Sequence, residues 1–151
     1  TIQAAVRATI SRGMHALGQN RVRETVLHAV ECAGQVRFAG INPTWYDVEQ
    51  LTNAKHAYDA LGLALYCALC HPEPTQESFE RAVALAVNHS GCSSTVGALT
   101  GQILGTMHGM SVIPPRWLAQ LELRDVIVEL GEDLATQHQP GPEWRKRYPP
   151  L

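Results

Sequence analysis

Apolar residues recur at spacings of three and four along most of the chain, which is the pattern of helices that bury one face. In the first segment, Val6, Ile10 and Met14 lie on one such face. No run of four or more residues alternates between apolar and polar side chains, so the sequence predicts an all-α fold. The predicted helices span residues 2–17, 21–38, 46–70 with an irregular start near 52–53, 75–88 with an N-cap at Thr75, 94–108 and 125–134.

Four glycines recur every fourth residue in the helix predicted over 94–108 and just beyond it: Gly97, Gly101, Gly105 and Gly109. Each interior glycine costs about 1 kcal/mol of helix propensity relative to alanine. A helix with such a stripe is expected where neighbouring elements approach closely, so we predict that this helix is buried, central and tightly packed. The alternative, a pair of membrane helices, would need a long apolar span, and no stretch of eighteen apolar residues occurs.

Composition indicates one globular domain. The chain has 151 residues, of which 45% are apolar and 17% charged, with a net charge of −2. This balance argues against a disordered chain and against nucleic-acid binding, and no membrane span is expected. We predict a helical domain over 1–136 and an extended, Pro-rich tail over 137–151. The chain begins at Thr1, so either an initiator was removed or it starts inside a longer product.

The four cysteines indicate a reducing, cytoplasmic compartment, because three of them lie inside helical segments rather than in a loop-rich disulfide framework. No basic and apolar leader precedes them to signal export. Cys67, Cys70 and His71 match the spacing of c-type haem attachment. The same thiols with His56 or His71 are a zinc alternative. The structural alternative is that both cysteines are small buried residues and that His71 is a cation at the helix end.

A small, hydroxyl-rich loop, Ser90–Thr95, joins an alanine-rich helix to the glycine-striped helix, and Ile113-Pro114 and Trp117-Leu118 follow. This order resembles the ADP-ribosylglycohydrolase family, which includes the dinitrogenase-reductase-activating glycohydrolases and crystallin J1-like proteins. The resemblance covers about 2–134 and the C-terminal half of a family member. It implies an orthogonal multi-helix bundle.

The resemblance also implies a metal site, from which this sequence departs. In the family, a Gly-Gly-Asp-Thr-Asp-Thr loop holds two magnesium ions that bind ADP-ribose. Thr95 matches the final threonine, whereas Cys92 and Ser94 stand at the two aspartate positions. Magnesium prefers anionic oxygen ligands, so we expect it to be absent or weakly bound here. The family's other acidic motif, Ser/Thr-Asp-Asp-Thr, does not occur.

What remains is a loop that enters a helix N-terminus, where free N–H groups favour an anion. We predict that Ser90, Gly91 and Ser93 accept a phosphate or ribose oxygen of an ADP-ribose-like ligand. The alternative is that Ser93 or Ser94 only caps the helix. His108 is either a hydrogen-bonded core histidine or a functional residue, and no catalytic residue is assigned.

These observations predict an ADP-ribosylglycohydrolase-like protein that is catalytically impaired. The alternative is an active, magnesium-dependent hydrolase that removes ADP-ribose from modified proteins once an N-terminal half completes it. A half-fold exposes apolar surface, so we also expect a protein partner or a homodimer to cover such a face.

Overall fold

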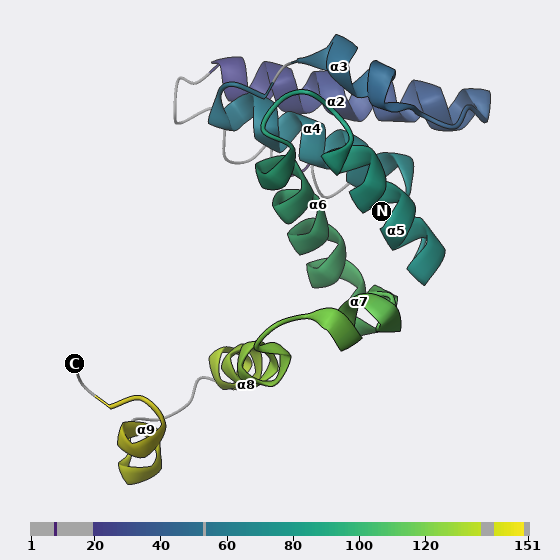
Figure 1. Cartoon of the computed structure of the whole chain (residues 1–151). Coiled ribbons are helices and arrows are strands. Elements are labelled where there is room, and N and C mark those ends of the chain that lie inside the picture. Colours follow the sequence, from purple (N-terminus) through teal and green to yellow (C-terminus); the bar gives the residue numbers. More distant parts are fainter. Residues whose placement is uncertain (1–7, 9–19, 53, 137–140, 150–151) are drawn as a thin grey trace. The chain divides into compact units, whose positions relative to one another are not determined.

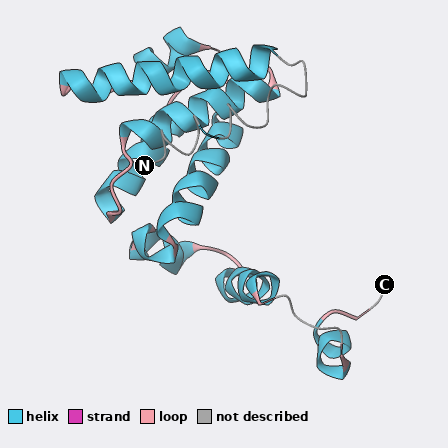
Figure 2. Ribbon diagram, turned by 180° about the vertical axis from the view of Figure 1, so that it is seen from behind, coloured by secondary structure: helices cyan, strands magenta, loops and turns pink. Residues whose placement is uncertain are grey.

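The structure is a computed structural model that describes residues 8, 20–52, 54–136 and 141–149. Helices and loops make up the described residues, and no strand occurs among them (Figure 2). This confirms the all-α prediction. The helix predicted over 2–17 lies outside the described residues apart from Ala8. The chain divides into two compact units, Thr1–Pro114 and Pro115–Leu151.

The first unit is built around one enclosed helix. Its elements are α2 (Asn20–Ala39), α3 (Trp45–Leu51), α4 (Ala57–Cys70), α5 (Gln76–Val87), α6 (Ser93–His108) and the short 3-10 helix η2 (Met110–Val112). Helix α4 packs against α2, α5 and α6, and α6 runs steeply away from the pair α2 and α4 (Figure 1).

Helix α4 is apolar nearly all round, as expected of a helix with neighbours on several sides. Its residues from Gly62 to Cys70 are all buried. Leu63, Tyr66 and Cys67 are at most 2% exposed and form the centre of the core. Many α4 residues are small, so the surrounding helices can come close to its backbone.

The prediction of one helix over 46–70 is wrong, because α3 ends at Leu51 and α4 begins at Ala57. Each of the two helices begins with a capping contact of its own. Thr44 donates its backbone N–H to Asp47 Oδ2 at 2.7 Å, and His56 donates its N–H to Asp59 Oδ2 at 3.3 Å. Each carboxylate lies three residues after the residue it caps, so each marks a helix N-terminus.

The glycine-striped helix α6 is confirmed, but its predicted central position is wrong. Only Val96, Gly97, Thr100 and Leu104 are buried among its residues. A Cβ at Gly97 would lie 2.6 Å from Val87 Cγ1, whereas a Cβ at Gly105 would meet nothing within 4 Å. The glycines therefore allow a close approach to α5 at the start of α6 and are not required by packing near its end.

The second unit contains α7 (Pro115–Gln120), α8 (Arg124–Ala135) and α9 (Pro142–Arg147). Helix α9 lies in the segment expected to be extended, and its ends explain the difference: proline and an acid occupy its first turn and three bases its last. Arg147 also pairs with Asp133 and Glu129 of α8 at 2.8 and 2.9 Å, and Tyr148 donates to Asp133 at 2.9 Å.

Candidate functional site

The loop between α5 and α6 is held by two backbone contacts. Ser90 donates its N–H to Glu49 Oε1 of α3 at 3.0 Å, and Gly91 donates its N–H to Nδ1 of His89 at 3.0 Å. Because Nδ1 accepts, the ring proton of His89 lies on Nε2. That atom is buried and finds no hydrogen-bond partner among the described residues. The sequence pattern did not reveal Glu49 or His89 as supports, because their role depends on contacts across the fold.

The loop ends at Cys92, which is the N-cap of α6 and makes no side-chain capping hydrogen bond. The first helical bond runs from Val96 N–H to Cys92 O at 3.1 Å. Neither Ser93 nor Ser94 is therefore the N-cap of α6, since both lie inside its first turn. Within the described part of the chain, the N–H groups of Ser94 and Thr95 have no hydrogen-bond partner.

The residues at the family's metal positions lie together but do not fit magnesium. Cys92, Ser94 and Thr95 are all exposed on the loop and the first turn of α6, and they offer one soft sulfur and two neutral hydroxyls. Magnesium needs hard, anionic oxygen ligands. Among the described residues, no group of three or more histidine, cysteine or acidic side chains is placed to hold a metal ion.

The burial of Cys67 and Cys70 disfavours the haem and zinc alternatives. Cys67 is fully buried, and burial raises the pKa of its thiol above the ordinary range. Burial raises the pKa of Cys70 to about 12, so neither thiol is poised as a nucleophile or ligand. His56 lies at the opposite end of α4, about 20 Å along the helix axis. The two cysteines are core residues.

Two histidines that the sequence singled out, His108 and His71, have structural surroundings. His108 Nε2 lies 3.1 Å from the carbonyl oxygen of Pro72, as expected of a hydrogen-bonded, half-buried histidine. His71 is the C-cap residue of α4. Burial lowers the pKa of His71, the charge of Glu73 opposes this shift, and Arg81 and Arg37 add to it. The structure therefore disfavours the predicted cation at the end of α4.

The lowered pKa of His71 predicts an acid-sensitive stability. Unfolded His71 takes up a proton near its ordinary pKa of about 6.5, while the folded protein resists it. The stability that neutral His71 contributes to the folded protein is thus complete above pH 6.5. It is lost as pH falls through the lower folded pKa. We expect the free energy of unfolding in urea to decrease from pH 7 to pH 5, and to decrease less in His71→Gln. Equal slopes in the two proteins would contradict the assignment.

An open cleft of about 670 Å³ lies between the start of α3 and α5. Its lining includes Trp45, His71, Arg81 and Asn88. Trp45 is 53% exposed and packs edge-on against Tyr46 with ring centroids 6.0 Å apart. Asn88 is the C-cap of α5, two residues before the loop. The sequence analysis missed this cleft, because residues from two distant segments form it.

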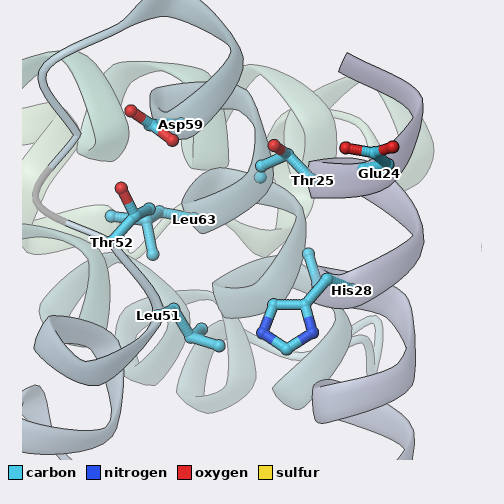
Figure 3. A pocket seen from close by; sticks show the side chains of 9 residues that line it. Glu24, Thr25, His28, Leu51, Thr52, Asp59 and Leu63 are labelled. Atoms are coloured by element: carbon cyan, nitrogen blue, oxygen red, sulfur yellow. The ribbon is translucent and has the colours of Figure 1, made fainter. Parts of the chain in front are cut away.

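A smaller cavity of about 240 Å³ lies between α2 and the segment that enters α4 (Figure 3). Glu24, Thr25 and His28 of α2 line one side, with Thr52 and Asp59 across the opening. Gly62 and Leu63 form part of the lining on α4. One of its carboxylates, that of Asp59, is already engaged in capping α4. This cavity was not predicted from the sequence either.

Comparison with known proteins identifies partial relatives. ADP-ribosylarginine hydrolase Tri1 of Serratia proteamaculans is 30% identical over 86 residues, which cover 57% of this chain and 22% of that protein. Human ADP-ribosylhydrolase ARH3 is 28% identical over 81 residues, or 50% of this chain and 22% of that protein. An uncharacterized protein of Archaeoglobus fulgidus is 29% identical over 142 residues, or 89% of this chain and 44% of that protein.

The chain thus spans less than half the length of each of these relatives. No solved structure matches it. No helix among the described residues is both long enough and apolar enough to cross a membrane. The family model described as ADP-ribosylglycohydrolase matches residues 1–143, nearly the whole chain. Together with the helical fold and the loop at the start of α6, this match means that the chain belongs to the ADP-ribosylglycohydrolase family.

Proposed function

We propose that this chain binds an ADP-ribose-like ligand at the loop Ser90–Thr95 without the family's magnesium ions, and that it is catalytically impaired. The observation that carries the proposal is the start of α6. Two N–H groups, those of Ser94 and Thr95, lack partners among the described residues, while the neighbouring side chains are a thiol and hydroxyls. Such a helix N-terminus attracts an anion. The residues of the loop itself supply no carboxylate with which to neutralise two divalent cations.

The residues at the loop divide into two roles under this proposal. Ser90 and Ser93 present their hydroxyl groups to a phosphate or ribose oxygen, and Gly91 adds no side chain beside them. Glu49 and His89 hold the backbone of Ser90 and Gly91 at 3.0 Å each and so fix the shape of the loop. No residue is given a role in breaking the glycosidic bond.

The experiment combines binding with turnover. Titration calorimetry should detect ADP-ribose binding, and a protein ADP-ribosylated on arginine should release no ADP-ribose above background in excess Mg²⁺. Ser94→Glu adds a negative charge in the first turn of α6, which suits the helix but repels an anionic ligand. We expect it to weaken ADP-ribose binding roughly tenfold, about 1.4 kcal/mol, with Ser94→Gln as the uncharged control. Absence of binding, or equal effects of both variants, would refute the proposal.

The second candidate is an active magnesium-dependent hydrolase completed by another polypeptide segment. It is favoured by the partial coverage of the relatives and by the retained, exposed Thr95. A polypeptide bearing a Ser/Thr-Asp-Asp-Thr motif, added to this chain, should then restore release of ADP-ribose. Release that depends on both components and on Mg²⁺ would establish this candidate over the first.

A protein partner or a homodimer belongs to the same proposal. In the first unit, Phe38 is 96% exposed and Ile41 60% exposed, close together in sequence at the end of α2. Burying apolar side chains of this size is favourable, and a partner would do so. Light scattering of the purified chain distinguishes a dimer from a monomer. A cytoplasmic location is likewise proposed, since Cys32, Cys67, Cys70 and Cys92 are all free thiols.

A further inference from the structure

The open cleft between α3 and α5 differs in chemistry from the smaller cavity beside α2. Arg81 is among its described lining residues, and no carboxylate is. The cavity beside α2 has Glu24 and Asp59 instead. At about 670 Å³, the cleft falls within the usual size range of small-molecule sites. A cationic cleft of this size suits an organic anion.

We propose that this cleft binds a nucleoside phosphate, with the base against Trp45 and the phosphate at Arg81. Under the proposed function, this is the adenosine phosphate part of the ADP-ribose-like ligand. The inference rests on that function only for the identity of the ligand, because the lining residues of the cleft are separate from Ser90–Thr95.

Trp45 supplies the aromatic surface. It lines the cleft, and 53% of it remains exposed although it contacts Tyr46. Its backbone is held in place by the cap at the start of α3, where Thr44 and Asp47 are bonded at 2.7 Å. An exposed indole on a backbone held in this way is a stacking surface for a nucleobase.

Arg81 supplies the charge. Its guanidinium pairs with Glu77 one turn earlier on α5 at 2.6 Å, and both side chains are more than half exposed. Exposed pairs of this kind contribute at most about one kcal/mol, so a phosphate can compete for the arginine. Amides of Asn42 and Asn88 and the ring of His71 add hydrogen-bonding groups to the same lining.

The cleft also leads toward the loop. Along α3, Trp45 is followed one helical turn later, about 6 Å along the axis, by Glu49, which bonds the loop at Ser90. Along α5, the lining residue Asn88 is two residues from Ser90. The cleft and the loop are therefore close neighbours in the first unit.

Calorimetry with ADP tests the cleft through variants of its lining residues, because ADP carries the base and the phosphates of the ligand without its second ribose. We expect ADP to bind, and Trp45→Ala to raise its Kd roughly tenfold, as loss of base stacking does. Trp45→Phe should retain most of the affinity. Arg81→Gln should weaken ADP but not adenosine. Glu77→Gln frees Arg81 from its partner and should tighten ADP roughly threefold.

Controls come from the same unit. Phe38→Ala removes a more exposed aromatic ring and Arg23→Gln an exposed arginine, both on α2 and outside the cleft, so ADP affinity should not change. ADP that fails to bind, or binds folded Trp45→Ala and Arg81→Gln as it binds the unaltered chain, overturns the cleft assignment. If ADP binding depends on the cleft while Ser94→Glu leaves ADP-ribose binding unchanged, the proposed function fails and the cleft assignment stands.

Discussion

Replacing Cys92 and Ser94 by aspartate makes ADP-ribose binding dependent on magnesium. In the unaltered chain, residues 90–95 supply no carboxylate to Mg²⁺ and Glu49 already accepts the N–H of Ser90, so we expect Mg²⁺ to leave the affinity for ADP-ribose unchanged. The double variant supplies two carboxylates next to Thr95, and Mg²⁺ is commonly held by one or two carboxylates together with substrate phosphates. We expect roughly tenfold tighter binding in saturating Mg²⁺ than in EDTA, about 1.4 kcal/mol, by calorimetry.

The double variant Cys92→Asn/Ser94→Asn is the matched control, because asparagine has nearly the same shape and no charge. It should show no response to Mg²⁺. Without the metal, the two aspartates should weaken ADP-ribose binding, because they repel its phosphates. In Mg²⁺ the same two aspartates should strengthen it. A double aspartate variant that folds, yet responds to Mg²⁺ no more than the asparagine control does, would show that the loop is not the magnesium position.

Substituting Gly62 by alanine destabilises the first unit. Gly62 lies on α4 facing α2, and a Cβ there would be 2.5 Å from Thr25 Cγ2 and 3.5 Å from the Thr25 carbonyl oxygen. Overpacking of this kind costs about 1–3 kcal/mol, more than the helix propensity that alanine gains. We expect the free energy of unfolding, measured in urea, to fall by about 1–2 kcal/mol.

Thr25→Ser removes the methyl group that the new Cβ would meet, so it should restore most of the loss in the Gly62→Ala background. Gly105→Ala is the control for helix propensity, since nothing lies within 4 Å of its Cβ position. That variant should gain about 1 kcal/mol. If the Gly62 and Gly105 variants change stability in the same direction, the close contact between α2 and α4 is not what determines the cost.

The helices could be predicted from the sequence where their ends carry local capping residues. The predicted N-cap Thr75 accepts the N–H of Ser78 at 3.2 Å, and α5 begins where the pattern placed it. The break between α3 and α4 was expected only as an irregular start near 52–53, because apolar spacing continues through it. The cap of Asp59 on His56 overrides that spacing. The position of a helix within the fold is harder to predict. The spacing of apolar residues indicates that one face is buried, but not which neighbouring helices cover it. Hence α6 was expected in the centre, which α4 occupies.

The site was predictable only in part, for a similar reason. A contiguous loop such as Ser90–Thr95 carries its chemistry in its own residues, so its hydroxyls and its missing carboxylates could be recognised directly. Glu49 is 41 positions away along the chain from Ser90, and the cleft combines Trp45 with Arg81. Only the fold brings such residues together. His89 gave no signal, because a single histidine beside a loop is a common pattern.

The four cysteines differ in exposure, and this difference can be used in an experiment. Cys92 is exposed, Cys67 and Cys70 are buried, and Cys32 is partly covered. In a Cys32→Ser background, a maleimide dye added to the native protein should therefore attach at a single place, the first residue before α6. Fluorescence from that dye would report ligand arrival at the loop directly, with no engineered thiol.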